Sequence, residues 1–167
     1  MTIAAFDQLN NERKKELLLT CCGSQQWVNN MVELLPYEDL VDVMEDAEQV
    51  WYGLDEPEWL HAFSHHPKIG DLSSHQEKFA STAHLASAEQ ASMATATDAT
   101  MHELAELNQR YESKFGFIFI ICATGRSPKE MLQSINQRLA NDRDTELENA
   151  VNEQNEIIKL RLQKLFV

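Results

Sequence analysis

Apolar residues recur at helical spacing along most of this chain, and that pattern narrows the folds open to it. Leu40, Val43, Ala47 and Trp51 fall three or four positions apart, as they would on one face of a helix. Glycine and proline, which punctuate loops and β-turns, number only 5 and 4 in 167 residues. We therefore predict an all-α protein, a single compact domain over residues 1–167 with about eight helices.

Residues with cap-forming side chains stand where the helices are expected to begin. Asn10 or Asn11 can cap one of them and Ser24 another, and Ser127-Pro128-Lys129-Glu130 has the form of a capping box with proline at the first helical position. Asp144 is expected to cap the last helix, which should run from Thr145 to near the C-terminus. The remaining expected helices lie at 40–51, 55–63, 83–94 and 101–114.

Charge and composition exclude several classes of partner. The formal net charge of −13 argues against a nucleic-acid ligand, because phosphate binding needs a basic surface. No apolar run approaches the ~20 residues that span a bilayer, and the N-terminus lacks a signal-peptide pattern, so no membrane partner is expected. The three cysteines follow no metal-binding or redox spacing, which favours a reducing cytoplasm.

The stretch His65-His66-Pro67-Lys68-Ile69-Gly70-Asp71 has the form of a stiffened loop. A residue before proline is disfavoured in the α conformation, so His66 should lie in extended backbone. Gly70 then permits a tight reversal of the chain. A titratable ring on such a loop suits acid–base chemistry, although a surface histidine in a turn between helices is the plainer interpretation of these residues alone.

The seven residues from Phe117 to Ala123 are all apolar and follow Gly116. Such a run indicates a buried extended segment or a short buried helical turn. The chain offers no second strand to pair with it. If the segment is extended, its main-chain amides need other partners, and a bound ligand is one possibility.

Two further charged residues stand in unusual surroundings. Arg161 falls in or beside an apolar stripe that includes Val151 and Ile158, where a guanidinium needs a carboxylate, carbonyls or an anionic ligand. It could instead reach solvent at the rim of that stripe. Glu89 is the only strong base in a run of small residues, where its pKa can rise toward values suited to acid–base catalysis. The alternative is a solvated glutamate on an alanine-rich helix.

The six histidines raise the question of a metal. His61 and His65 are four positions apart and could share a helix face, but the chain has no H-E-x-x-H motif and no His/Cys cluster. No metal site is therefore expected. A zinc-dependent hydrolase using His61, His65 or His66 with Glu89 remains an alternative, as does a helical interaction module without catalysis.

Taken together, these motifs resemble the 2-oxo-4-hydroxy-4-carboxy-5-ureidoimidazoline (OHCU) decarboxylases of urate breakdown. The stretch 66–71 is similar to their His-Pro-Arg-Ile-Gly-Asp signature, and Glu89-Gln90 resembles the end of their Ser-x-x-Glu-Gln motif. Residues 107–119, written Leu-Asn-x-x-Tyr-Glu-x-Lys-Phe-Gly-Phe-x-Phe, resemble their third signature. The similarity extends in order over almost the whole chain.

The resemblance implies an all-α homodimer in the cytoplasm that decarboxylates OHCU to (S)-allantoin with no metal or organic cofactor. It implies that His66 is the catalytic acid and that Glu89 is its acidic partner. The residues it places at the substrate are Pro67, Ala86, Ser87, Glu89, Gln90, Phe119, Ile120, Ile121, Cys122, Ala123 and Arg161.

Three positions depart from the family pattern. Lys68 replaces the usual arginine, and Ile118 replaces a common proline. Ala86 stands where the family has serine, with Ser87 one residue along, so a hydroxyl contact is lost or supplied differently. None of these changes removes the expected acid, carboxylate or arginine.

Overall fold

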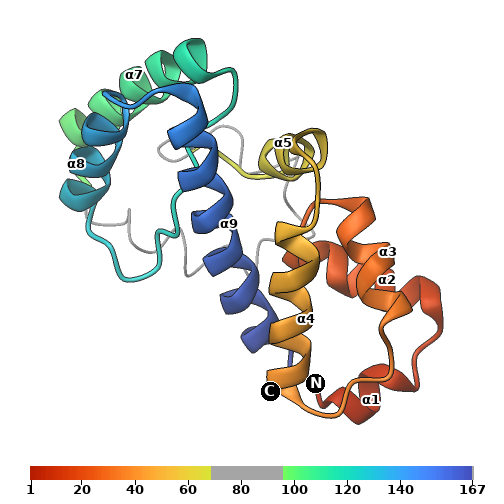
Figure 1. Ribbon diagram of the computed structural model, residues 1–167. Coiled ribbons are helices and arrows are strands. Elements are labelled where there is room, and N and C mark those ends of the chain that lie inside the picture. The colour runs from red at the N-terminus through yellow and green to blue at the C-terminus, as the bar shows by residue number, and fades with distance from the viewer. Residues whose placement is uncertain (69–95, 167) are drawn as a thin grey trace. The chain divides into compact units, whose positions relative to one another are not determined.

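The computed structural model describes residues 1–68 and 96–166, and every regular element in these ranges is a helix (Figure 1). This confirms the all-α fold class, whereas the helix expected over 83–94 lies outside the described residues. None of the described helices is long and apolar enough to span a bilayer. The helices are α1 (Ile3–Asp7), α2 (Asn11–Cys21), α3 (Gln25–Glu33), α4 (Leu40–Tyr52), α5 (Glu56–Ser64), α7 (Asp98–Phe115), α8 (Pro128–Arg138) and α9 (Arg143–Leu165).

Three of the four predicted caps are formed, at Asn10, Ser24 and Ser127. The Asn10 and Ser24 side chains accept hydrogen bonds from the main-chain N–H groups of Arg13 and Trp27, at 2.8 and 3.0 Å. The capping box at Ser127 is formed in full. The cap expected at Asp144 is wrong: the Asp142 carboxylate accepts from the Thr145 N–H at 2.8 Å, so α9 begins at Arg143.

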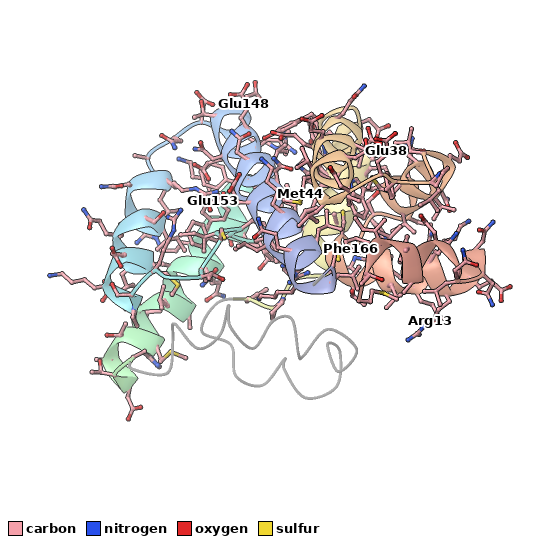
Figure 2. All side chains as sticks on the ribbon, turned by 90° about the horizontal axis from the view of Figure 1, so that it is seen from below. Arg13, Glu38, Met44, Glu148, Glu153 and Phe166 are labelled. Carbon is pink, nitrogen blue, oxygen red and sulfur yellow. The ribbon has the colours of Figure 1, made fainter. Side chains whose placement is uncertain are left out.

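The chain contacts divide the molecule into two compact units. The first comprises residues 1–62 and 155–167, in which α2 packs on α3 and α3 on α4. Its core holds Trp27, whose indole N–H donates to the Ala47 carbonyl at 3.1 Å. Phe166, close to the end of the chain (Figure 2), packs edge to face on Phe6.

The second unit comprises residues 63–154, and in it α7 packs on α8. Its core centres on Tyr111, whose ring contacts the rings of Phe115, Phe117 and Phe119 at centroid distances of 4.6, 5.9 and 5.2 Å. α9 contributes residues to both units. That the two units make one domain stays a prediction.

Candidate active site

His66 lies two residues beyond the end of α5, outside any helix. Its main-chain N–H donates to the Phe63 carbonyl at 3.0 Å, and its side chain is half-buried, as is Pro67. Phe63 is buried and packs on Phe117 with ring centroids 5.7 Å apart, so the start of this loop is anchored in the core of the second unit. His66 thus lies outside a helix, as predicted, in a bend, and the extended backbone expected for it stays a prediction.

Lys68, one of the departures from the family pattern, forms an ion pair. Its ammonium lies 2.5 Å from a carboxylate oxygen of Glu112 on α7, with side-chain exposures of 44% and 42%. The described part of the His-Pro loop is therefore linked at both ends, to the core through Phe63 and to α7 through Lys68. The lysine supplies this contact as a single point charge, without the two-pronged geometry of arginine.

The apolar run after α7 passes through the second unit without forming a helix. Gly116 ends α7 in the left-handed conformation, with φ of 81°, which glycine adopts without strain. Phe117, Phe119, Ile121 and Ala123 are buried, Ile118 and Cys122 are only half-buried, and Ile120, at 2% exposed, interrupts the alternation. This near alternation of exposure agrees with the extended alternative of the sequence analysis.

Side chains of α8 and α9, rather than a second strand, satisfy part of this segment's main chain. Arg138 donates to the Ile120 carbonyl at 2.7 Å, and its guanidinium lies 4.6 Å from the centroid of the Phe119 ring. Glu153 accepts from the Cys122 N–H at 2.7 Å and pairs with Arg126 at 3.1 Å. Two main-chain groups of the segment, the Ile120 carbonyl and the Cys122 N–H, therefore have side-chain partners.

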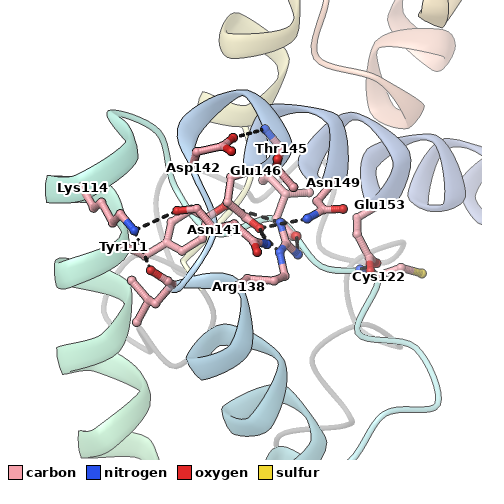
Figure 3. A network of polar contacts seen from close by, with 12 residues as sticks. Tyr111, Lys114, Cys122, Arg138, Asn141, Asp142, Thr145, Glu146, Asn149 and Glu153 are labelled. Atoms are coloured by element: carbon pink, nitrogen blue, oxygen red, sulfur yellow. Dashed lines mark hydrogen bonds and ion pairs between the residues drawn. The ribbon is translucent and has the colours of Figure 1, made fainter.

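Arg138 belongs to a buried polar network in the second unit (Figure 3). Its guanidinium lies 2.9 Å from the Glu146 carboxylate, which is fully buried and also accepts from Tyr111. Asn141 and Asn149 donate to the other oxygen of Glu146 at 2.8 and 2.9 Å. Every polar atom of this carboxylate therefore has a partner, as a buried charge requires.

The network shifts the titration of its members. Burial by itself would raise the pKa of Glu146, but the hydrogen bonds from Tyr111 and Asn149 and the charge of Arg138 outweigh it, and the pKa is lowered. Burial, together with the neighbouring Glu146 carboxylate, raises the pKa of Tyr111, so the phenol remains a donor. No motif or periodicity in the sequence marks Arg138, Glu146 or Glu153 as functional.

Arg161 lies on α9 in the first unit and is 6% exposed. Of the two alternatives that the apolar stripe left open, the structure shows the buried one, and the alternative in which the side chain reaches solvent at the rim is wrong. One of its nitrogens donates to the Thr20 carbonyl at 3.4 Å. Burial raises the pKa of the nearby Cys21 and Cys22 thiols to about 12, although the Arg161 charge opposes the shift. These cysteines remain thiols and are not activated nucleophiles.

The expected site residues fall into three sets. His66, Pro67 and the segment Phe119–Ala123 belong to the second unit, and Arg161 belongs to the first. The other four, Ala86, Ser87, Glu89 and Gln90, lie outside the described residues, as does the turn expected at Gly70. The convergence of His66, Glu89 and Arg161 on one cavity therefore stays a prediction.

His61 and His65 are candidate metal ligands by their spacing of four positions. His61 lies on α5, while His65 lies just past the end of that helix, and both side chains are exposed. Among the residues that the structure describes, no group of three or more His, Cys, Asp or Glu side chains is arranged to hold a metal ion. The zinc alternative thus gains no support from this part of the chain.

Curated relatives of the chain act in uric acid degradation. It is 38% identical over 147 residues to the uric acid degradation bifunctional protein TTL of Arabidopsis thaliana, a match covering 87% of this chain and 45% of that protein. It is also 38% identical over 61 residues to the OHCU decarboxylase of Xenopus laevis, covering 36% of this chain and 35% of the relative. The chain thus matches less than half the length of each of these two relatives.

Solved structures give a longer match. A crystal structure of OHCU decarboxylase in the presence of (S)-allantoin superposes with a TM-score of 0.78 and 37% identity, covering 90% of this chain and 97% of that one. A crystal structure of (S)-allantoin synthase superposes with a TM-score of 0.75, covering 99% of this chain and 54% of the other. At 15% identity, the second match shows the shared fold alone.

The sequence model of the OHCU decarboxylase family matches residues 7–163, which includes all three motifs described above. The resemblance seen in the motifs and the likeness of the fold to a decarboxylase structure agree with this match. The chain belongs to the OHCU decarboxylase family.

Proposed function

We propose that this chain is a carboxy-lyase that converts OHCU to (S)-allantoin in urate breakdown, using neither a metal nor an organic cofactor. The observation that carries the proposal is the family match over residues 7–163, which contains the His66-Pro67 motif, the segment Phe119–Ala123 and Arg161. The 37% identity to an OHCU decarboxylase structure with (S)-allantoin present supports the same reaction. We further propose that the enzyme acts as a homodimer in the cytoplasm.

The reaction can proceed without a cofactor because the substrate accepts its own electrons. When the bond to CO₂ breaks, the electron pair left on carbon passes into the adjoining C=N or carbonyl system of the imidazoline. The protein must then orient the carboxylate, balance the developing negative charge and deliver one proton to one face of the carbon. These are tasks for an acid, a cation and hydrogen-bond donors.

The proposed roles follow the family motifs. His66 delivers the proton, since an imidazole titrates near neutral pH and this one is held on a loop anchored through Phe63. Glu89 orients that ring and hydrogen-bonds the substrate hydroxyl. Arg161 holds an anionic or carbonyl oxygen of the substrate. The remaining proposed pocket residues are Pro67, Ala86, Ser87, Gln90, Phe119, Ile120, Ile121, Cys122 and Ala123.

The test supplies freshly generated OHCU to the purified chain and follows the circular dichroism of the product. We expect the appearance of (S)-allantoin to be faster than the spontaneous reaction and unchanged by EDTA. A racemic product formed at the spontaneous rate would contradict the decarboxylase assignment. Loss of the activity with EDTA and its return with zinc would point instead to a metal-dependent hydrolase.

A further inference from the structure

The segment Phe119–Ala123 is held at two points by side chains from two different helices. Arg138 of α8 binds the Ile120 carbonyl at 2.7 Å, and Glu153 of α9 binds the Cys122 N–H at 2.7 Å. Figure 3 shows Glu153 at Cys122, with its carboxylate directed at the main chain. Both contacts are charge-assisted, and such hydrogen bonds are shorter and stronger than those between neutral groups.

The two tethered residues, Ile120 and Cys122, are two positions apart in the chain. In extended backbone, the main-chain groups of residues i and i+2 point to one edge, and those of residue i+1 point to the opposite edge. The tethers from α8 to the Ile120 C=O and from α9 to the Cys122 N–H agree with this arrangement, which assigns the N–H and C=O of Ile121 to the other edge. Among the described residues, no hydrogen bond involves the main chain of Ile121, which is 4% exposed.

The tether at Arg138 is rigid because its own charge is balanced. The guanidinium donates to Glu146 and Tyr111, and its central carbon lies 4.6 Å from the centroid of the Phe119 ring. The Arg138 side chain is only 10% exposed, so it cannot reorient without leaving the Glu146 carboxylate buried and unpaired. The segment is thus held in place by the rigid network through the hydrogen bond from Arg138 to the Ile120 carbonyl.

We propose that Arg138 and Glu153 are positioning residues for decarboxylation: they fix Phe119–Ala123 so that the Ile121 main-chain groups meet the substrate in a set orientation. This inference rests on the proposed function, in which the segment lines the pocket. Neither residue touches the substrate. Each acts through the main chain, and a displacement of about 1 Å is enough to cost on the order of 10²-fold in rate.

Glu153 gives the sharper test, because its side chain is 20% exposed and its removal leaves the buried network intact. We expect Glu153→Ala to lower kcat on the order of 10-fold to 100-fold per folded molecule, with a smaller change in KM. Amide exchange at Cys122 should become faster in the same variant. Glu153→Gln keeps an oxygen acceptor for the Cys122 N–H, and it should recover most of the lost kcat.

Arg126→Ala is the matched control, since it removes the ion pair at 3.1 Å while leaving the Glu153 contact to Cys122 in place. Its kcat should stay near that of the unmodified chain. Unchanged kcat and KM in Glu153→Ala, in a preparation whose unmodified chain makes (S)-allantoin, would overturn the positioning role alone. An inactive unmodified chain would instead overturn the decarboxylase assignment and this inference with it. Equal losses in Glu153→Ala and Glu153→Gln would also contradict the tether, because the charge and not the acceptor would then matter.

Discussion

Two ion pairs hold the two described parts of the proposed site in the second unit, and they differ in exposure. Arg138 and Glu146, which support the segment Phe119–Ala123, have side-chain exposures of 10% and 0%. Lys68 and Glu112, which support the His-Pro loop, have exposures of 44% and 42%. Both pairs bring a cation within 3 Å of a carboxylate oxygen, so burial rather than distance separates them.

The difference predicts that one part of the site is fixed and the other adjustable. A buried pair cannot be broken cheaply, because either partner left alone is a desolvated charge. An exposed pair exchanges its partner for water at little cost. The segment Phe119–Ala123 is therefore held rigidly, while the loop that carries His66 can adjust.

The largest expected effect comes from breaking the buried pair. Arg138→Met leaves Glu146 buried without its cation and should lower the free energy of unfolding by about 3–5 kcal/mol. Urea denaturation followed by far-ultraviolet circular dichroism measures the loss. A loss below about 1 kcal/mol would remove the distinction between the two pairs.

The double substitution Arg138→Met with Glu146→Leu provides the control for that measurement. Replacing both charges with apolar groups of similar size removes the unpaired carboxylate, so stability should recover relative to Arg138→Met alone. A double variant as unstable as the sum of the two single variants would mean that the two side chains act independently.

Acid should remove part of the same stabilisation. Because the pKa of Glu146 is lowered in the folded protein, its contribution is present above the unfolded value of about 4.3 and is lost as the pH falls through the folded pKa. The stability difference between the unmodified chain and Glu146→Gln should therefore shrink as the pH is lowered from about 5. A difference that stays constant down to low pH would contradict the charged state of this carboxyl.

A smaller effect is expected at the start of α8, the helix that carries Arg138. Ser127 and Glu130 form the capping box there, with Ser127 N–H 2.7 Å from the Glu130 carboxylate. Ser127→Ala should cost about 0.5–2 kcal/mol of unfolding free energy, measured by the same denaturation. Ser127→Asp, which keeps a capping oxygen, should retain most of the stability, and equal losses in both variants would argue against capping as the cause.

The smallest effect is expected at the exposed pair. Lys68→Ala should change the free energy of unfolding by less than about 1 kcal/mol, and salt should weaken even that contribution. Comparing the loss at low and high ionic strength checks both points. A salt-independent loss as large as that of Arg138→Met would show that the His-Pro loop is as rigidly held as the segment.

Local signals in the sequence were sufficient for most of the fold. A helix cap depends only on residues three positions away, so the sequence alone indicates the helix starts at Asn10, Ser24 and Ser127. The five-residue helix α1 was missed, because so short an element shows no periodicity. The predicted start of the last helix lies two residues too far along the chain. Asp142 and Asp144 can both act as N-cap residues, and only the hydrogen bond from the Thr145 N–H to Asp142 distinguishes them.

The support of the candidate site was harder to foresee, because its contacts join distant residues. The apolar stripe marked Arg161 as unusual but left burial and the solvent-exposed rim as alternatives, and only the packing of α9 shows that the side chain is buried. Glu146 is one of 27 acidic residues, and its partner Tyr111 lies 35 positions away, so no local pattern marks it. The one available signal was the unpaired apolar run after Gly116, whose main chain had to find partners elsewhere.

The most direct test of the account is the rate of (S)-allantoin formation by His66→Ala. The His66 side chain is half-buried just past the end of α5, so the variant should fold, as its far-ultraviolet circular dichroism would show. If His66 delivers the proton, turnover should fall on the order of 10²–10⁴-fold, the usual worth of a general acid. Near-normal formation of (S)-allantoin by the folded variant would remove His66 from the mechanism and contradict the account.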